Sequence, residues 1–497
     1  MRFRSLSGMV GMTLAAIFAI AALPAAAGTP SFGSGSPSGV AAQAPECVPV
    51  PGTECGSVRV PLFRSRPGGP GIDIGYALIR HRDPALPVAR GTVAFNPGGP
   101  GQNVIDGAAG WTELLAGLLD DHDLLLIDPR GTGRSHPLDC GLTELPATTQ
   151  RYVRAIGRCG KRLGRQSRAY TSAATADDFE AVRAHLGIPK LDLYGVSYGT
   201  YLMTVFAQRH PASVRSIVLS SAFPLRFDMW ARANAHAMRL AIRRVCARST
   251  TGNCNGARTL RQLGRLARRL RANPIPYQVD GGRRILDATA LAGIAYAADV
   301  SIGQLPAIVR AALRGDTGPL IEAASALSQF SGSQVPGISQ NLAQTFAIAC
   351  NDYPTLWDRR ASIPVRERQF AARRARLDQS PFRPFTERAW TSAITDRGNA
   401  CIRWPDRRGP VQRTSGPFHD VPVLVTSGDL DPNVPTAEGR QAARQFPHAR
   451  VVEVPNAGHA PELEATGCAA SIISDFIRNQ RLGDTSCLAK IPPVAVN

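Results

Sequence analysis

Strand-like and helical segments alternate along this chain, and the alternation constrains its fold more than any other feature. The segments up to residue 219 are, in order, strands at 58–63, 74–80, 92–95 and 122–127, a helix at 175–186, a strand at 191–196, a helix at 200–209 and a strand at 216–219. Strands separated by helices pair in parallel. The pattern therefore predicts an α/β fold with a mostly parallel sheet and helices on both faces.

The alternation stops once, between residues 225 and 416, where the pattern is helical and rich in Arg and Ala. After this stretch come a strand at 421–426, a helix at 436–445, a strand at 450–454 and a helix at 461–478. These late strands need a sheet to join, so we expect one sheet domain formed by residues 46–224 and 417–497, with 225–416 inserted as a helical cap. An independent helical domain is the alternative, and it would leave the late strands without a sheet.

The N-terminus has the three parts of a secretory signal. Two arginines in the first four residues precede an apolar run from Met9 to Leu23 and three alanines at 25–27. A retained membrane anchor is the alternative, but the run is short and Pro24 breaks it. We expect residues 1–27 to be a cleaved signal peptide and 28–45 a flexible leader. The mature chain, which has no transmembrane segment by this reading, would be secreted, with association with the cell surface left open.

The ten cysteines agree with export, because an even number outside a reducing compartment indicates disulfides. The sequence does not determine their connectivity, but they fall into sequential couples. Our hypothesis is Cys47–Cys55, Cys140–Cys159, Cys246–Cys254, Cys350–Cys401 and Cys468–Cys487. No Cys-x-x-Cys or Cys/His cluster has the spacing of zinc ligands, so no metal site is predicted.

The net charge of +19 raises the question of a nucleic-acid partner. The basic residues are nearly all arginines and are scattered, with the densest run from Arg261 to Arg271. Leu263, Leu266 and Leu270 recur there at helical spacing, which predicts a solvated basic face above buried leucines. Aromatic residues make up 6% and do not interleave with the arginines. We expect no specific nucleic-acid binding; weak adhesion to anionic polymers or a cell surface stays open.

A Gly-Val-Ser-Tyr-Gly segment, Gly195–Gly199, lies where a predicted strand ends and a predicted helix begins. A sharp turn at this junction lifts the serine hydroxyl clear of the backbone, and the glycines on both sides relieve its clashes. The helix N-terminus behind it favours developing negative charge. This context predicts Ser197 as a nucleophile.

A serine needs a base to take its proton. His459 is the strongest candidate, because it follows Gly458 in a loop just after the strand that ends at Val454. A surface-loop histidine is the alternative reading. Two other histidines fit structural roles better: His122 opens a strand beside acidic residues, and His185 lies near the end of a helix.

The base in turn needs a carboxylate that holds its tautomer. Asp429 and Asp431 both follow the strand at 421–426, and we favour Asp431, with Asp429 as a turn acid. The order Ser197, Asp431, His459 along the chain is that of one serine-hydrolase architecture and not of others.

Backbone N–H groups must stabilise the oxyanion that forms on attack. The segment Asn96–Gly101 follows the strand at 92–95, and its glycines permit a close approach to the serine. We expect the N–H of Tyr198 and that of Gly98 or Gly99 to form the oxyanion hole. A plain Pro/Gly turn is the alternative. No Gly-Lys-Ser/Thr follows, which excludes a phosphate-binding loop, and no cofactor is implied.

Together these motifs resemble the peptidase branch of the α/β-hydrolases, which includes proline iminopeptidases and secreted bacterial tripeptidyl aminopeptidases. The matching segments are Asn96–Gly101, Asp128–Ser135, Gly195–Gly199, Cys350–Asp352, Cys401–Pro405, Asp431–Pro435 and Gly458–His459. The chain departs from the family at Asn96, where proline iminopeptidases have His, at Gln102, where Gly is usual, and at Asn433–Val434.

The resemblance implies an α/β-hydrolase fold and a secreted exopeptidase that releases short N-terminal pieces from peptide substrates through an acyl-enzyme. It also implies a cap that supplies acids for the substrate amine, and Asp352 is our hypothesis for such an acid. A structural acceptor beside a disulfide is an equal alternative. A carboxylesterase or lipase on the same scaffold is the nearest rival. A non-catalytic binding protein is a further one, which the intact motifs disfavour. Peptide length preference, natural substrate and oligomeric state are not predicted.

Overall fold

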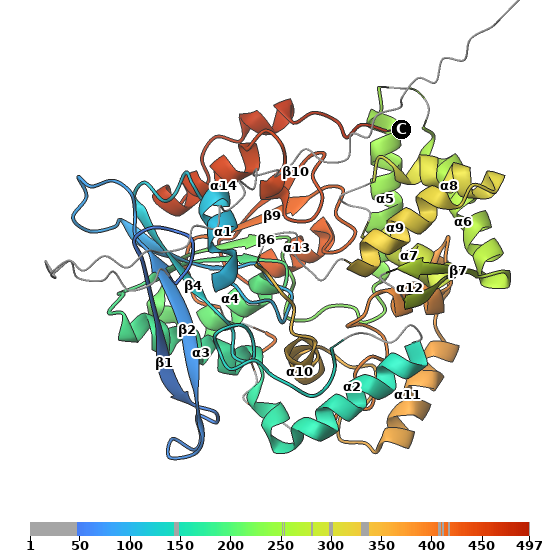
Figure 1. Ribbon diagram of the computed structural model, residues 1–497. Coiled ribbons are helices and arrows are strands. Elements are labelled where there is room, and N and C mark those ends of the chain that lie inside the picture. The colour runs from blue at the N-terminus through green and yellow to red at the C-terminus, as the bar shows by residue number, and fades with distance from the viewer. Residues whose placement is uncertain are drawn as a thin grey trace, which may run out of the picture. The chain divides into compact units, whose positions relative to one another are not determined.

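An eight-stranded sheet with the order β1-β2-β4-β3-β5-β6-β9-β10 forms the centre of the computed structural model (Figure 1). The structure describes residues 47–143, 149–250, 252, 254–279, 282–297, 302–329, 337–405, 409, 412–415 and 418–496. The strands are β1 (Thr53–Pro61), β2 (Gly71–Ile79), β3 (Gly91–Asn96), β4 (His122–Ile127), β5 (Leu191–Val196), β6 (Val214–Ser220), β9 (Val423–Gly428) and β10 (Arg450–Val454). Only β2 runs antiparallel to its neighbours β1 and β4, so the predicted mostly parallel α/β fold is confirmed.

Helices cover both faces of the sheet, as predicted. Strand β5 is buried along its whole length, and its side chains alternate between two cores. Leu191 and Leu193 pack into the core under α3 and α4, and Tyr194 and Val196 pack into the core under α1 and α14. A parallel strand in this position has no solvent-facing side, which explains its continuous apolar run in the sequence.

The helices and short turns have the following bounds. The α-helices are α1 (Ala108–Leu114), α2 (Thr149–Leu163), α3 (Ser172–His185), α4 (Tyr198–Arg209), α5 (Arg232–Arg248), α6 (Gly256–Ala272), α7 (Ala288–Tyr296), α8 (Leu305–Arg314), α9 (Gly318–Gln329), α10 (Leu342–Asp352), α11 (Ile363–Ala375), α12 (Glu387–Ala393), α13 (Thr436–Ala443) and α14 (Cys468–Asn479). The 3₁₀ turns are Ile105–Gly107, Gly164–Ala169, Pro211–Ser213, Ser380–Phe382, Pro461–Leu463 and Ser486–Lys490.

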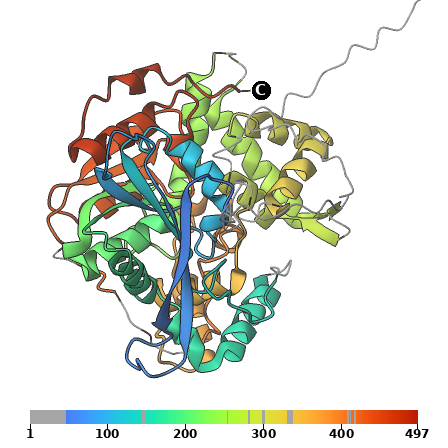
Figure 2. The same ribbon diagram turned by 60° about the vertical axis from the view of Figure 1, so that its left-hand side comes forward.

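Between β6 and β9 the chain forms helices α5–α12, as the long helical stretch in the sequence predicts. Figures 1 and 2 show α5–α9 grouped on one side of the sheet, away from α2 and α11. A two-stranded hairpin, β7 (Ile275–Val279) with β8 (Gly282–Leu286), was not expected there, because its short strands are only partly buried and carry little apolar signal. Helix α2 was not predicted either. The predicted helix at 461–478 is interrupted, since Gly467 has a φ of 71° and caps the start of α14.

The domain boundaries at residues 225 and 416 stay a prediction, because Glu46–Asn497 form one compact unit. The predicted signal peptide 1–27 and leader 28–45 lie outside the described residues. Within the described ranges, the structure contains no helix that is both long and apolar enough to cross a membrane.

Disulfides join all ten cysteines, each of which lies in a described segment. The pairs are Cys47–Cys55, Cys140–Cys159, Cys246–Cys254, Cys350–Cys401 and Cys468–Cys487, the same sequential couples as in the hypothesis. The pair Cys350–Cys401 spans the longest separation, 51 residues, and connects the end of α10 to the segment after α12.

Replacing Cys350 and Cys401 together by Ser is expected to lower the free energy of unfolding by about 4 kcal/mol, because a long loop regains its entropy in the unfolded chain. The matched variant at Cys47 and Cys55, which are separated by 8 residues, should lose less, about 2.5 kcal/mol. Urea unfolding of both double variants measures the difference. An equal or reversed loss would contradict the loop-length argument.

Candidate active site

Ser197 stands at the junction between β5 and α4 in a strained backbone conformation. Its φ is 56° and its ψ is −126°, a combination that L-residues rarely adopt and that marks functional turns. The flanking glycines are required by space: a Cβ on Gly195 would lie 2.4 Å from the carbonyl carbon of Gly199, and one on Gly199 would lie 2.1 Å from Asn96 O. The segment therefore has the elbow geometry that the sequence predicts.

The side chains of His459 and Asp431 contact each other directly. The Nδ1 atom of His459 lies 2.9 Å from Oδ2 of Asp431. A carboxylate oxygen only accepts, so this contact assigns the imidazole proton to Nδ1 and leaves Nε2 with the basic lone pair. The other carboxylate oxygen of Asp431 accepts hydrogen bonds from the N–H groups of Asn433 and Val434, at 2.7 and 2.9 Å. Its side chain is completely buried, and the contacts hold it in one orientation.

The sheet order explains how residues so distant in sequence come together. Strands β5, β6, β9 and β10 are consecutive neighbours, and all run parallel. Ser197 follows β5, Asp431 follows β9 and His459 follows β10. Since the carboxyl ends of parallel strands share one edge, the three residues lie at the same edge of the sheet.

Asp429, the rival acid, has a different environment. Its Oδ2 accepts a hydrogen bond from Nη2 of Arg248 at 2.5 Å, and its Oδ1 accepts one from the N–H of Asn456 at 2.8 Å. These contacts tie α5 and the loop after β10 to the end of β9. The structure thus places Asp431, and not Asp429, against His459.

The segment after β3 packs directly against the elbow. A Cβ on Gly98 would lie 3.0 Å from the backbone nitrogen of Tyr198, and the φ of 108° at Gly98 also requires glycine. The N–H of Gly98 is already donated to Oδ1 of Asn96, at 3.1 Å. In the described part of the chain, the N–H groups of Gly99 and Tyr198 make no such hydrogen bond. Of the two glycines predicted, Gly99 is therefore the better donor to an oxyanion.

Two residues of this site were missed in the sequence analysis. Ser221, just after β6, donates its hydroxyl to Oδ2 of Asp431 at 3.0 Å and accepts the N–H of Ala460 at 3.1 Å. It thereby connects the acid to the loop that carries His459. Glu462 is buried beyond that loop and accepts a hydrogen bond from Ser220, and burial raises the pKa of its carboxyl. In the sequence, Ser221 is only the second serine of a Ser-Ser pair at the end of a strand. Nothing in the sequence indicates that it contacts Asp431, or that Ser220 contacts Glu462.

The motif Asp128–Ser135, which carries part of the family resemblance, supports the site without entering it. Asp128 is buried and accepts the N–H groups of Val104 and Ile105, at 2.6 and 3.0 Å, so it holds the chain just after the glycine segment. Arg130 is also buried and forms a two-pronged ion pair with Asp178 of α3, with both distances 2.6 Å.

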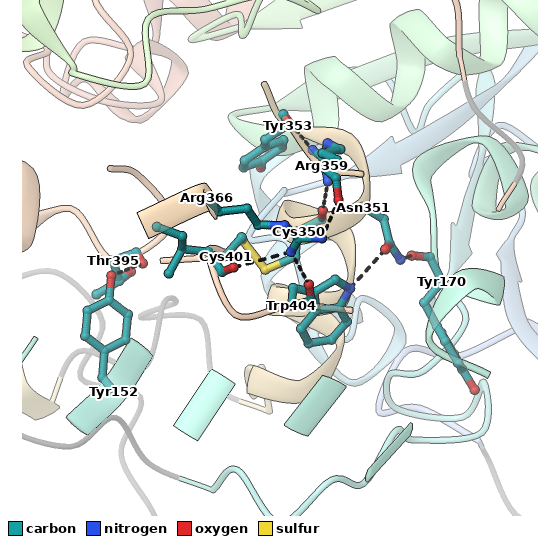
Figure 3. Close-up of a disulfide and its surroundings, with 11 residues drawn as sticks. Tyr152, Tyr170, Cys350, Asn351, Tyr353, Arg359, Arg366, Thr395, Cys401 and Trp404 are labelled. Atoms are coloured by element: carbon teal, nitrogen blue, oxygen red, sulfur yellow. Dashed lines mark hydrogen bonds between the residues drawn. A yellow bond between two sulfur atoms is a disulfide. The ribbon is translucent and has the colours of Figure 1, made fainter. Parts of the chain in front are cut away.

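Asp352 lies at the end of α10, one residue from the Asn351 side chain shown in Figure 3. Asn351 accepts from Nε1 of Trp404 at 3.1 Å and donates to the carbonyl of Tyr170 at 2.9 Å. Asp352 uses Oδ2 to accept the N–H of Ser172 at the start of α3, at 2.6 Å. Its Oδ1 has no hydrogen-bond partner among the described residues.

Asp352 also lines a cavity of about 550 Å³, together with Trp357, Trp404 and Gln412. None of Ser197, Asp431 and His459 lines this cavity. A link to the elbow exists through Ser172, whose hydroxyl lies 2.8 Å from the Tyr198 hydroxyl. Oδ2 of Asp352 therefore acts as a structural hydrogen-bond acceptor for Ser172. Binding of a substrate amine by Oδ1 of Asp352 remains a prediction.

Burial raises the pKa of Asp352 to about 6. The folded protein then holds this proton more tightly than the unfolded chain does, so the group lowers stability as pH rises from about 4 to about 6. The Asp352→Asn variant has no carboxyl at this position and so lacks this pH-dependent loss of stability. The stability of the variant relative to the natural protein is expected to rise across that window, as measured by urea unfolding at several pH values. The exposed Asp475→Asn on α14 serves as control, and a flat difference for Asp352→Asn would contradict the raised pKa.

Two family models match the two segments that carry the residues of this site. Residues 91–243, which contain the glycine segment and Ser197, match the model described as alpha/beta hydrolase fold. Residues 386–487, which contain Asp431 and His459, match the model described as TAP-like protein.

Three curated relatives cover different shares of the chain. The serine protease Hip1 of Mycobacterium tuberculosis (strain ATCC 25618 / H37Rv) is 32% identical over 199 residues, which are 35% of this chain and 37% of the relative. The tripeptidyl aminopeptidase of Streptomyces lividans is 32% identical over 202 residues, 36% of this chain and 37% of the relative. This chain thus matches little more than a third of their length. Carboxylesterase B of M. tuberculosis (strain CDC 1551 / Oshkosh) is 26% identical over 467 residues, 87% of this chain and 85% of the relative.

The sheet order and the strained serine agree with the first family model, and the Asp431–His459 pair lies within the second. The chain has the α/β-hydrolase fold, and its C-terminal part is similar to the TAP-like family model.

Proposed function

We propose that this protein is a serine exopeptidase that removes short N-terminal pieces from peptides through an acyl-enzyme. The observation that carries the proposal is the 2.9 Å contact between His459 Nδ1 and Asp431 Oδ2, at the sheet edge that bears Ser197. The TAP-like match, and partial relatives named serine protease and tripeptidyl aminopeptidase, support peptides as the substrate class.

In the proposed reaction, Ser197 Oγ attacks the scissile carbonyl carbon while His459 Nε2 takes its proton. The tetrahedral oxyanion is stabilised by the N–H groups of Tyr198 and Gly99. The C–N bond then breaks, and His459 gives its proton to the leaving amine. Water, deprotonated by His459, hydrolyses the acyl-enzyme and regenerates the hydroxyl. Asp431 holds the tautomer and stabilises the imidazolium throughout.

Residues 225–416 form the cap in this proposal and limit access to one end of the substrate. Asp352 Oδ1 is the proposed acceptor for the substrate's free amine, because it is a buried carboxylate oxygen without a hydrogen-bond partner in the described structure, and Ser172 links Asp352 to Tyr198 of the elbow. An ammonium group would also relieve the cost of burying the ionised carboxylate.

The test uses the purified natural protein with aminoacyl, dipeptidyl and tripeptidyl anilides, their N-acetylated forms and short acyl esters. Hydrolysis of the free-amine peptides, blocked by N-acetylation, is the expected result. Asp352→Asn should raise KM for free-amine peptides several-fold and leave kinetics with the short acyl esters, which carry no amine, unchanged. If KM and kcat for free-amine peptides do not change, the amine-binding role of Asp352 is wrong and the structural reading holds.

A carboxylesterase is the second candidate, favoured by one observation. The relative named carboxylesterase B matches 87% of this chain, far more than the peptidase relatives match. The same triad hydrolyses esters by the same steps. Turnover of acyl esters without any turnover of anilides would decide for this candidate.

The proposal includes secretion of the protein after cleavage of residues 1–27. The five disulfides and the signal pattern at residues 1–27 support a secreted protein. N-terminal sequencing of the protein recovered outside the cell should find a start near residue 28. A start at Met1 would contradict cleavage.

A further inference from the structure

Two helices on different sides of the molecule, α2 and α6, present rows of cations with the same spacing. On α6 the row consists of Arg258, Arg261, Arg265 and Arg268, and on α2 it consists of Arg151, Arg154, Arg158 and Lys161. Each row steps by three, four and three residues, which places its members on one face of a helix. All eight side chains are exposed. We call these rows the α2 stripe and the α6 stripe.

Among the residues that the structure describes, no acidic side chain pairs with either stripe. Helices α2 and α6 contain no Asp or Glu. Of the eight stripe side chains, none forms an ion pair or a side-chain hydrogen bond in the described structure. Many exposed arginines elsewhere do have acidic partners, as Arg59 has Asp73 at 2.7 Å and Arg440 has Glu453 at 2.8 Å. No described carboxylate therefore competes with an external anion for the charge of the stripes.

The opposite face of each helix fixes the stripe in place. Leu263, Leu266 and Leu270 of α6 are buried, as the sequence predicts. On α2, the face opposite to the cations is also buried and includes Ile156. The disulfide between Cys159 and Cys140 attaches this helix to the preceding chain segment. Each stripe is thus held on a packed helix and needs no rearrangement to bind.

The geometry suits a linear partner. With a rise of about 1.5 Å per residue, successive cations lie roughly 4.5 to 6 Å apart along the helix, so four groups span about 15 Å. Seven of the eight are arginines, whose planar guanidinium binds phosphate through two parallel hydrogen bonds. A membrane surface is a poorer partner. The large apolar side chains that are exposed in the described structure, Val88, Ile285, Ile363, Val451 and Leu463, all lie outside α2 and α6.

We propose that the α2 and α6 stripes bind a linear polyanion that carries phosphate groups along its chain, and so hold the protein on such a polymer. This binding function is separate from hydrolysis. It uses no residue of the candidate active site, and it does not depend on the proposed function.

Long-chain inorganic polyphosphate is the probe, titrated against labelled full-length protein at several salt concentrations. Replacing the four α6 cations by Gln, or the four α2 cations by Gln, should each raise Kd at least tenfold at low salt. Combining both sets should abolish measurable binding. The slope of log K against log salt should become shallower in each variant, because fewer phosphates are neutralised and fewer counterions are released.

The matched control replaces Arg59, Arg82, Arg90 and Arg440 by Gln. These are exposed arginines that already pair with acids, and the substitutions change the net charge by the same amount. Unchanged binding by the control supports the stripes. An equal loss in the control would overturn the proposal and leave net charge as the cause.

Two further outcomes would also overturn it: binding to vesicles with anionic lipids but not to polyphosphate, or no binding to polyphosphate at all. Unfolding midpoints must stay unchanged in the stripe variants, which separates a loss of binding from a loss of folding. Absence of peptide hydrolysis by the natural protein would count against the proposed function and would leave this binding result intact.

Discussion

Ser197→Ala is expected to lower kcat for any hydrolysed substrate by about 10⁴-fold or more, because the hydroxyl is the only group that can form the acyl-enzyme in the proposed reaction. KM should change little, since the serine contributes more to the transition state than to ground-state binding. The measurement is steady-state kinetics with the best anilide or ester found for the natural protein. Labelling by a fluorophosphonate should disappear with the same substitution.

Ser471→Ala on the exposed face of α14 is the matched control and should change neither quantity. The unfolding midpoint of Ser197→Ala should not fall, because alanine has the same backbone strain as serine at this φ of 56° and the substitution removes only the hydroxyl. If the variant keeps its fluorophosphonate labelling, another residue is the nucleophile and the proposed site is wrong.

Asp431→Asn should lower kcat by about 10⁴-fold, the second large effect. Asparagine would present an N–H₂ or a carbonyl to His459 Nδ1, and the backbone N–H groups of Asn433 and Val434 would favour the carbonyl facing them. The amide would then donate to Nδ1 and force the imidazole proton onto Nε2, so the base could no longer accept the serine proton. Since the proposed donors to the oxyanion are untouched, activity above the uncatalysed rate should remain.

Asp429→Asn is the paired control two residues away. It should lower stability, because it removes an anion that pairs with Arg248, and it should change kcat far less than Asp431→Asn does. Chemical unfolding together with kinetics distinguishes the two variants. A larger loss of kcat for Asp429→Asn would reverse the assignment of the acid.

Much of the fold could be predicted from the sequence, because buried parallel strands appear in it as short, mostly apolar runs. Strands such as β4 and β5 are buried on both faces, so every position in them is constrained to be apolar or internally satisfied. The hairpin β7–β8 escaped prediction for the opposite reason, since its residues are at most partly buried except Leu286. Helix α2 was also missed, although its cations recur at helical spacing.

The sequence by itself determined the elements that repeat a local physical rule: the strand-turn-helix around Ser197, the glycines that its turn requires and the order of serine, acid and histidine. Each is set by neighbours in the chain, through backbone sterics and side-chain periodicity. Only the tertiary structure decided which of Asp429 and Asp431 faces His459, that Ser221 connects the acid to the histidine loop, and that Asp352 contacts Ser172 while lining a separate cavity. These relations join residues far apart in the chain, and only the packing of strands and helices sets the distances between them.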